Sequence, residues 1–374
     1  MKAIVVGAGP VGLTAALILA EGGAEVTLVE KREGLNTASR ASTFHPPTIE
    51  ILDRLGCAGP LLAEGVAVER IQYRTPEGVA AEFALALLAG ETRFPCRRHL
   101  EQARVTPALL ARLARRPNAR LRFGAEVVAV EQDGQEVRAV LAGGERLGAD
   151  ALIAADGAHS RLRAALGIGF PGFAYPHRVL RLMTEEDPSA LLPGLAPISY
   201  LHRGGRSLSF LRMPECWRII IRVPPDTPDS AALDDGWILA RLGEVLPHWS
   251  RLPRTLHRDL YAASRHLADR FHEGRVLLAG DAAHLTNTRG GMNMNAGIHD
   301  AWAIARALLS GGLAAARAAA EARRRIAAEK LLPRTDRSVT GGEGWLERVR
   351  AIAADPAAAR AFLREGAMLD MVAL

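Results

Sequence analysis

Residues 2–17 read Lys2-Ala-Ile-Val-Val-Gly7-Ala-Gly9-Pro10-Val11-Gly12-Leu-Thr-Ala-Ala-Leu. The apolar run at residues 3–6 predicts a buried parallel strand, and residues 10–21 predict the helix that follows it. Between them, Gly7, Gly9 and Gly12 complete the pattern G-x-G-x-x-G. In such a unit the first glycine permits a tight turn, the second leaves the backbone open to a close approach, and the third lets helix and strand pack closely.

A second predicted strand, at residues 25–30, ends in an acid. Glu30 stands eighteen residues after Gly12, where dinucleotide-binding folds carry the acceptor for a ribose hydroxyl. The N-terminus of the intervening helix offers free N–H groups and a positive dipole end to phosphates. Together these features predict a dinucleotide site, and they leave both NAD and FAD open. Three glycines and a proline among the first residues argue against a signal peptide or a membrane span at residues 3–20.

The overall composition is that of an ordinary soluble globular protein, with 49% hydrophobic and 24% charged residues among 374. The net charge of +6 comes mostly from arginines interleaved with acids, so we expect no nucleic-acid partner. The widely separated Cys57, Cys96 and Cys216 form neither a zinc knuckle nor a disulfide framework. We therefore expect no metal site, no integral membrane segment, and a cytoplasmic monomer or homodimer.

Helical and strand patterns continue through the rest of the chain. Up to residue 150 they predict a polar loop at 31–41, a helix at 48–55, antiparallel strands within 66–85, a helix at 106–115 with Pro107 first, and a meander at 121–123, 126–132 and 137–141. Residues 170–265 are richer in proline, aromatic residues and period-two runs, which predicts a mixed or antiparallel sheet. A helix at 295–309 and a helical tail from residue 313 follow.

Two further apolar strands end in loops of the kind that bind ligands. Residues 151–155 run into Asp156 and Gly157, and residues 275–279 run into Gly280 and Asp281. An isolated aspartate–glycine pair is more often only a turn. Ligands of open α/β sheets, however, bind at the carboxyl ends of the strands. We therefore expect both loops and the first glycine loop to line one crevice.

Three motifs occur in a fixed order: the N-terminal glycine fingerprint, Asp150-Ala-Leu-Ile-Ala-Ala-Asp156-Gly157-Ala-His-Ser160-Arg161-Leu-Arg163, and Arg275-Val-Leu-Leu-Ala-Gly280-Asp281-Ala-Ala-His284. Together they resemble the FAD-dependent aromatic hydroxylases, the p-hydroxybenzoate hydroxylase-like single-component flavoprotein monooxygenases. The resemblance covers about residues 1–330. It implies an α/β fold in which a Rossmann-type FAD-binding domain carries an inserted, mixed β-sheet substrate domain.

The domain division that this resemblance implies is discontinuous. The FAD-binding domain takes residues 1–70, 97–168 and 270–312, the substrate domain takes 71–96 and 169–269, and residues 313–374 form a C-terminal helical segment. The chain has no second G-x-G-x-x-G. NADH or NADPH is therefore expected to bind transiently on the flavin domain, while FAD is bound tightly.

The resemblance also assigns FAD contacts. The three glycines of the fingerprint would hold the pyrophosphate, Glu30 the adenosine ribose, and Asp281 the ribityl chain. The full set of expected contacts is Gly7, Gly9, Pro10, Val11, Gly12, Glu30, Lys31, Arg40, Gln102, Val127, Asp156, Gly280, Asp281, Gly291, Met292 and Asn293.

The implied reaction is hydroxylation of a small phenol-like or N-heteroaromatic molecule. NADH or NADPH would reduce FAD, O₂ would add to give a flavin C4a-hydroperoxide, and one oxygen atom would pass to the ring. Candidate residues for substrate binding or proton relay are His45, Tyr200, His202, Phe210 and Arg212, although each can equally be a packing or surface residue. Two alternatives remain open: a flavin-dependent oxidase or reductase on the same fold, and a non-enzymatic dinucleotide-binding protein.

One loop departs from the family pattern. Thr288 stands where relatives carry proline, and Asn293 replaces the last glycine of Gly-Gly-x-Gly. Because asparagine tolerates a positive φ better than most residues, we expect Asn293 to preserve the turn. Arg289 lies on the same loop, and we expect it to bind an anionic substrate or NAD(P)H rather than FAD, with a solvent-facing arginine as the alternative.

Overall fold

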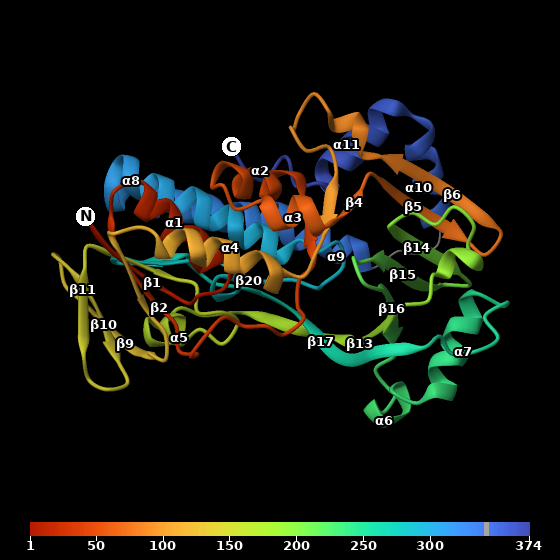
Figure 1. The fold of residues 1–374 in the computed structure, drawn as a ribbon, viewed down its shortest axis with the longest axis horizontal. Helices are drawn as coiled ribbons and strands as arrows, with labels where there is room; N and C mark the ends of the chain where they lie inside the picture. Colours follow the sequence, from red (N-terminus) through yellow and green to blue (C-terminus); the bar gives the residue numbers. More distant parts are fainter. Residues whose placement is uncertain (340–343) are drawn as a thin grey trace.

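The computed structural model describes residues 1–339 and 344–374, and it is organised by two large sheets (Figure 1). The first has six strands in the order β18-β19-β12-β1-β2-β8, and the second has eight in the order β20-β17-β13-β16-β15-β14-β5-β6. The long strands β13 (Gly172–Thr184) and β17 (Thr255–Leu267) pair along the second sheet and reach back toward the first (Figure 1). The predicted α/β class is confirmed.

The centre of the first sheet is parallel, as predicted. Its strands are β18 (His272–Glu273), β19 (Val276–Leu278), β12 (Ala151–Ala154), β1 (Lys2–Val6), β2 (Glu25–Val29) and β8 (Ala119–Arg122). β1 lies between β12 and β2 and pairs in parallel with both. Strands that are buried on both faces need continuous apolar runs, and this explains why the three motif strands lack polar alternation.

The predicted meander is wrong in one strand. Its members are β9 (Val127–Gln132), β10 (Val137–Leu141) and β11 (Arg146–Ala149). Residues 119–122 instead form β8, which pairs in parallel with β2 at the edge of the first sheet. Periodicity identifies a strand but does not identify its partner, because the partner depends on how the preceding helix returns the chain.

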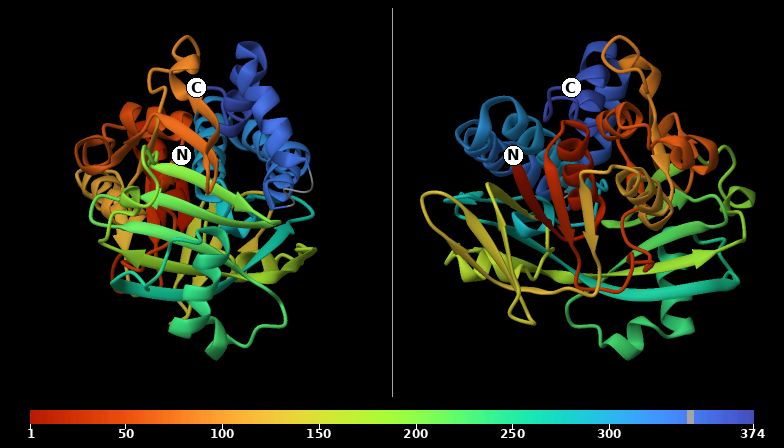
Figure 2. Two further views of the ribbon diagram at one scale, coloured as in Figure 1. Left: turned by 90° about the vertical axis from the view of Figure 1, so that its right-hand side faces the viewer. Right: turned by 60° about the vertical axis from the view of Figure 1, so that its left-hand side comes forward.

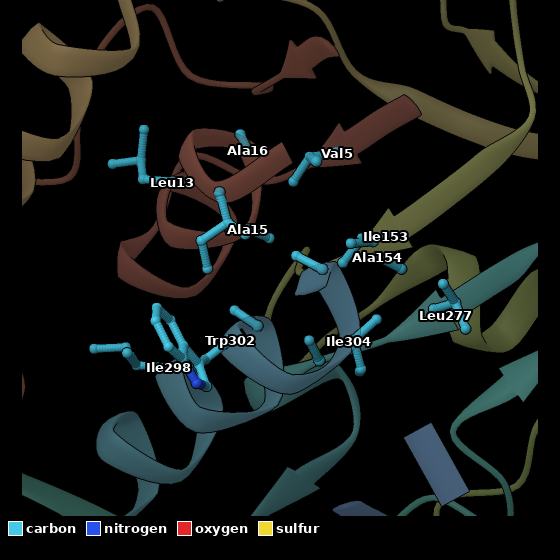
Figure 3. Close-up of a cluster of buried hydrophobic side chains, with 14 of the residues drawn as sticks. Val5, Leu13, Ala15, Ala16, Ile153, Ala154, Leu277, Ile298, Trp302 and Ile304 are labelled. Carbon is cyan, nitrogen blue, oxygen red and sulfur yellow. The ribbon is translucent and has the colours of Figure 1, made fainter. Parts of the chain in front are cut away.

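Helices cover the face of the first sheet opposite the meander (Figures 1 and 2). They are α1 (Pro10–Glu21), α4 (Gln102–Ala114) and α8 (Asn293–Ile326). In the core, Ala15 of α1 lies on the side of its helix that faces Trp302 of α8, and Leu13 lies on the side turned away from α8 (Figure 3). Small alanines on α1 let the two helices approach each other and the sheet closely.

Two helix boundaries differ from the sequence prediction. α4 begins at Gln102 and contains Pro107 in its interior. The turn before Pro107 forms because it is anchored to another segment, with the Gln102 N–H donating to the carbonyl oxygen of Ala41 at 3.0 Å. α8 extends well beyond residue 309 and passes a non-helical Gly312, with φ of 66°.

The remaining helices are α2 (Pro46–Arg54), α3 (Gly59–Glu64), α5 (Arg161–Ala165), α6 (Asp229–Ala232), α7 (Asp235–Val245), α9 (Leu332–Val339), α10 (Trp345–Ala354) and α11 (Pro356–Gly366). Among them, α2, α5 and those of the tail match the predictions in outline, whereas α3, α6 and α7 were not predicted. The tail from residue 313 is helical, as expected. None of the helices in the described residues is long and apolar enough to cross a membrane.

The second sheet is covered differently on its two faces. Its other strands are β5 (Arg70–Thr75), β6 (Gly78–Ala84), β14 (Ile198–Arg203), β15 (Arg206–Arg212), β16 (Trp217–Val223) and β20 (His284–Leu285). One face packs Leu208, Phe210 and Ile219 against α7. On the other face, β5, β6 and β14 contact α10 and α11, and the rest of that face borders the cavity described below.

The turn from β1 into α1 depends on close backbone packing. Gly7 has φ of 106°, and a side chain there would overlap the carbonyl oxygen of Ala155 at the end of β12. A Cβ at Gly12 would overlap the carbonyl oxygen of Gly7 itself. These two glycines are therefore required by the packing of the protein, whether or not a ligand is bound.

We expect a Gly12→Ala substitution to lower the free energy of unfolding of the FAD-free protein by about 3 kcal/mol, because the new methyl group meets rigid backbone. Gly243→Ala in α7 is the matched control, since its Cβ would meet nothing within 4 Å, and it should be neutral or stabilising by up to about 1 kcal/mol. Urea denaturation followed by circular dichroism measures both. Equal stabilities would contradict the packing argument.

Candidate functional site

The three strand-end loops line a single cavity of about 920 Å³. Gly7 at the end of β1, Asp156 after β12 and Asp281 after β19 all contribute to its wall. This arrangement follows from the register, because Val6, Val29 and Ala154 are the last paired residues of neighbouring parallel strands. The expected convergence of the loops is therefore confirmed. The cavity continues from these loops to the open face of the second sheet.

At one end of the cavity the start of α1 is open to a ligand. Gly9 is the N-cap of α1, and no side chain caps the helix. In contrast to Gly7 and Gly12, a Cβ at Gly9 would meet no heavy atom within 4 Å. Gly9 therefore keeps space free in the cavity rather than relieving a clash within the protein. Free N–H groups at the positive end of a helix dipole fit a pyrophosphate.

Glu30 is fixed beside this helix by two backbone hydrogen bonds. Its Oε2 accepts the N–H of Ala8 at 2.8 Å, and its Oε1 accepts the N–H of Arg32 at 3.0 Å. The residue is 9% exposed and lines the cavity. Since each carboxylate oxygen can accept more than one hydrogen bond, Glu30 is held in place and can still accept ribose hydroxyls.

Asp156 presents an unsatisfied acceptor to the same cavity. Its Oδ2 accepts the N–H of Leu162 at 3.3 Å, whereas its buried Oδ1 has no hydrogen-bond partner among the described residues. α5 starts beside it with Ser160 as the N-cap, accepting the N–H of Arg163 at 3.0 Å, as predicted. Because a buried acceptor without a donor is costly, the free oxygen fits a hydroxyl group or water of a bound dinucleotide.

Asp281 is held by a chain of buried polar groups. The Asn293 side-chain amide donates to Asp281 Oδ1 at 2.8 Å, and its oxygen lies 3.0 Å from His284 Nδ1. His284 Nε2 lies 2.8 Å from Asp300 Oδ2. Arg323 Nε donates to the other oxygen of Asp300 at 2.7 Å. His284 and Asp300 are 0% and 1% exposed.

The geometry of this chain fixes the charge on His284. The Asn293 oxygen and the Asp300 carboxylate are both acceptors, so His284 must donate from both ring nitrogens and is therefore an imidazolium. Burial lowers the pKa of His284, but attraction and hydrogen bonding by Asp300 outweigh it and raise the pKa above its ordinary value. Burial raises the pKa of Asp300, yet His284 and Arg323 lower it to about 2. Burial also raises the pKa of Asp281, while His284 and the Asn293 amide oppose the rise.

The expectation for the backbone of Asn293 is wrong. The residue is the first of α8 and has no positive φ; that conformation occurs instead at Gly290 and Gly291, with φ of 84° and 61°. Those two glycines complete the turn, so position 293 already belongs to the helix. Its side chain is then free to bridge Asp281 and His284, which a glycine could not do.

The other expected cofactor residues fall into two groups. Those that line the cavity together with Gly7, Gly9 and the residues already described are Pro10, Val11, Lys31, Arg40, Gln102, Val127, Gly291 and Met292. Gly12 and Gly280 do not line it. A Cβ at Gly280 would come within 2.9 Å of a Val11 methyl carbon. Close packing against Val11 therefore explains why position 280 is glycine. Direct contact of each residue with FAD stays a prediction.

The far end of the cavity is the open face of the second sheet. Its wall mixes aliphatic and aromatic side chains with arginines, and it comprises His177, Val179, Arg181, Ile198, Tyr200, Ser207, Ser209, Leu211, Arg218, Ile220, Arg222, Asp259, Tyr261 and Ala263. Apart from Tyr200, none of these residues was predicted from the sequence. The sequence of β16 does carry a pattern that indicates such a face. Arg218, Ile220 and Arg222 alternate with Ile219 and Ile221, so one face of the strand carries the arginines and the other is apolar.

Most of the predicted substrate residues do not line the cavity. Phe210 is fully buried under α7, and Arg212 lies 5.6 Å from the Trp217 ring centroid on the same face. The register explains the error, since Tyr200 pairs with Ser209 while Phe210 pairs with Ser199. Ser209 and Leu211, not Phe210 and Arg212, therefore share the face of Tyr200.

The two predicted histidines also lie outside the cavity lining. His202 stacks on Tyr73, with ring centroids 6.4 Å apart, and burial together with nearby arginines lowers its pKa to about 4. His45 is completely buried, and its Nε2 lies 2.8 Å from the carbonyl oxygen of Gly290. Burial lowers the pKa of His45 well below its ordinary value. His45 thus supports the loop at residues 286–292 (the 290 loop) through this hydrogen bond to its backbone.

Two of the arginines in the wall are tied to acids and serines. Arg181 donates to both oxygens of Asp259 at 2.7 and 3.0 Å. Arg218 donates to Ser42 at 2.7 Å and pairs with Glu101. These contacts connect the second sheet to the loop after β2 and to the start of α4.

The described residues contain no group of three side chains suited to holding a metal ion.

Comparison with known proteins identifies the family. The FAD binding domain family matches residues 1–334. The para-nitrophenol 4-monooxygenase of Pseudomonas sp. strain WBC-3 is 31% identical over 82% of this chain and 77% of its own length. The chain belongs to the FAD-dependent aromatic hydroxylases. A second relative in this family, the 6-hydroxy-3-succinoylpyridine 3-monooxygenase of Pseudomonas putida strain S16, is 32% identical over 81% of this chain and 78% of its own length.

Solved structures of FAD-dependent aromatic hydroxylases share the fold. The p-nitrophenol 4-monooxygenase of Pseudomonas putida DLL-E4 superimposes with a TM-score of 0.88 at 27% identity and covers 98% of both chains. An aklavinone-11 hydroxylase in complex with FAD and aklavinone gives a TM-score of 0.75 at 26% identity, over 91% of this chain and 68% of that one. The open helix end, the fixed Glu30 and the free oxygen of Asp156 fit the FAD that this family binds.

We expect Gly9→Val to weaken FAD binding at least tenfold, which is about 1.4 kcal/mol, without destabilising the fold. The backbone at Gly9, with φ of −74° and ψ of 176°, suits valine, but the new side chain would enter the pyrophosphate space. Gly59→Val is the matched control, because its Cβ at the start of α3 also meets nothing within 4 Å. Titration of the apoproteins with FAD measures binding. An unchanged affinity in Gly9→Val would show that the pyrophosphate does not bind at this loop.

We expect Asn293→Gly, which restores the family residue, to raise the dissociation constant for FAD about tenfold, since a hydrogen bond to a charged group is lost. Asn293→Asp should weaken binding further, because two carboxylates would face each other where the amide now bridges. The measurement is again titration of the apoproteins with FAD, with circular dichroism as a check on folding. Wild-type affinity in both variants would show that Asn293 does not position Asp281.

Proposed function

We propose that this protein is an FAD-dependent monooxygenase that uses NADH or NADPH to hydroxylate a small aromatic molecule. The observation that carries the proposal is the single cavity, which runs from a dinucleotide cradle to a mixed apolar and cationic wall. The relatives support it, because para-nitrophenol is a phenol and 6-hydroxy-3-succinoylpyridine is a hydroxylated N-heteroaromatic compound. A substrate of either kind would lie between the 290 loop and the second sheet.

Bound FAD would supply the electron transfer and the activation of O₂. The protein supplies binding and orientation: the start of α1 and Glu30 hold one end of the cofactor, and Asp281 holds its ribityl chain. Ile198, Leu211 and Ile220 provide an apolar surface for an aromatic ring. Such a surface also keeps water away from the reacting atoms.

Tyr261 is the best-placed residue for a proton-donating role at the ring. It lines the cavity on β17, and its hydroxyl lies 3.4 Å from the hydroxyl of Thr288 on the 290 loop. Burial raises the pKa of Tyr261 above its ordinary value, so the phenol stays protonated near pH 7. A protonated phenol can donate a hydrogen bond to an oxygen atom on the substrate.

A flavin-dependent oxidase or reductase on the same fold is the second candidate. It would use the same cofactor cradle and would differ only in the fate of the oxygen. The large cavity wall formed by the second sheet favours the monooxygenase. An oxidase of nicotinamide nucleotides has no need for a separate aromatic site. The two are distinguished by the product rather than by the fold.

The test is NAD(P)H oxidation by the FAD-loaded protein with and without para-nitrophenol and a panel of phenols and hydroxypyridines. We expect slow flavin reduction alone, at least tenfold faster reduction with a suitable aromatic compound, and incorporation of oxygen-18 from labelled O₂ into the product. Fast reduction that is indifferent to every aromatic compound, with hydrogen peroxide as the sole oxygen product, would establish the oxidase.

A further inference from the structure

The first half of the 290 loop is held by the buried side chain of Asn287. This residue is 3% exposed and lines the cavity together with Thr288 and Arg289. Its side-chain nitrogen donates to the carbonyl oxygen of Thr335 in α9 at 2.7 Å and to the hydroxyl of Tyr175 in β13 at 3.3 Å. Its side-chain oxygen accepts the N–H of Arg289 at 2.9 Å. The amide therefore joins the loop to α9 and to the second sheet.

The partners of Asn287 determine the orientation of its amide. The Thr335 carbonyl can only accept and the Arg289 N–H can only donate, so the nitrogen faces α9 and the oxygen faces the loop. The Tyr175 hydroxyl donates to Asp336, and its oxygen is then free to accept from Asn287. Burial raises the pKa of Tyr175 above its ordinary value, so the phenol remains a protonated donor near pH 7. A buried polar group whose donors are all used specifies one arrangement of its neighbours.

The helix to which Asn287 is tied is itself anchored on two sides. Arg334 in α9 donates to both carboxylate oxygens of Asp370, near the C-terminus, at 3.0 and 2.9 Å. Asp336 in α9 pairs with Arg265 of β17 at 3.0 Å. α9 is therefore a fixed support for the loop, and the two bonds from Asn287 transmit its position to the cavity.

The second half of the loop has its own supports. The carbonyl oxygen of Gly290 lies 2.8 Å from His45 Nε2. The side-chain nitrogen of Asn295 donates to the carbonyl oxygens of Gly291 and Thr43 at 2.6 and 2.9 Å. These bonds hold residues 290 and 291 at the start of α8, on the far side of the loop from α9.

Between the two supports the loop meets the wall of the second sheet. The hydroxyl of Thr288 lies 3.4 Å from that of Tyr261, the residue with a proposed role at the substrate ring. A threonine does not fix the backbone φ as a proline would, so the position of residue 288 depends on the bonds on either side of it. Loss of the bond from Asn287 to α9 would let Thr288 move away from Tyr261.

We propose that Asn287 is a positioning residue for the aromatic substrate. By tying the 290 loop to α9 and Tyr175, it sets the width of the space between this loop and the second sheet. The inference rests on the proposed function, because that space is the one assigned to the substrate. Through Asn287 the helices of the C-terminal segment act on the substrate end of the cavity, although they are remote from it in sequence.

Asn287→Asp separates the two roles of the amide. A carboxylate still accepts the Arg289 N–H, but it faces the Thr335 carbonyl oxygen with no hydrogen to donate. In the FAD-loaded protein we expect hydrogen exchange of residues 286–292 to be at least tenfold faster than in the wild type, because the loop opens more readily. With the aromatic compound that best stimulates NAD(P)H oxidation, we expect a KM about tenfold higher and about threefold less hydroxylated product per NAD(P)H. The affinity for FAD should stay within threefold.

The pH dependence of Asn287→Asp provides a further readout. Burial raises the pKa of a carboxyl group, and the protonated form can again donate to the Thr335 carbonyl. The bond to α9 is therefore present below this raised pKa and is lost as the pH rises through it. The ratio of the KM of the variant to that of the wild type should fall as the pH is lowered from about 8.5 to about 5.5, because asparagine does not titrate.

Asn118→Asp is the matched control. Asn118 also donates from its side-chain nitrogen to two carbonyl oxygens, those of Ala20 and Ala24 at 2.9 and 2.7 Å, but it does not line the cavity. The control should lose stability while keeping wild-type exchange in residues 286–292 and a wild-type KM. If Asn287→Asp fails to fold, Asn287→Ser replaces it, since a serine hydroxyl can accept the Arg289 N–H but is too short to reach α9.

Two results would overturn the inference while the proposed function stands: wild-type exchange of residues 286–292 in Asn287→Asp, or faster exchange with an unchanged KM and an unchanged yield of product. An equal rise of KM in Asn118→Asp would also overturn it, because the effect would then follow from lost stability. Failure of the wild type to transfer labelled oxygen to any aromatic compound would instead overturn the proposed function. The exchange measurement needs no turnover and would still show whether Asn287 holds the loop.

Discussion

The close contact between the β1–α1 turn and the end of β12 is the constraint on which the rest of the site depends. Gly7 and Gly12 let the backbone pass against Ala155, where any side chain would overlap a carbonyl oxygen. The contact brings the start of α1 to the level at which the neighbouring strands end. Glu30, Asp156 and Asp281 then face one cavity because their strands are in register, with no further adjustment of the loops.

A buried network of the charged side chains of His284, Asp300 and Arg323 holds this arrangement in place. Burying Asp300, His284 and Arg323 carries a desolvation cost that an apolar cluster would avoid, so the network is better understood as a positioning device than as a source of stability. It ties the loop after β19 to α8, and Arg323 also donates to the carbonyl oxygen of Met371 near the C-terminus. The last residues of the chain thus support the cofactor end of the cavity, although they are far from it in sequence.

Sequence reasoning succeeded where local geometry determines the outcome. The glycine fingerprint, the strands that end at Asp156 and Asp281, and the cap at Ser160 all follow from the needs of single turns. It failed where the answer depends on packing between distant segments. The two-residue turn at Gly204 and Gly205 sets the register of β14 with β15 and places Phe210 on the face opposite Tyr200. Which of the two faces packs against α7 is not visible within either strand. Asn293 could not be placed for a related reason, since the turn ended one residue before it.

The same contrast explains how the two ends of the cavity are built. The cofactor end relies on backbone geometry at Gly7 and Gly12 and on acids held by hydrogen bonds from backbone N–H groups and from Asn293. The substrate end relies on alternate side chains of β15 and β16, whose other face is already buried against α7. Positions such as Ser209 and Arg222 contribute nothing to that core and can change independently of it. In the proposed function, the fold would fix where the flavin chemistry takes place, and one face of the second sheet would select the aromatic substrate.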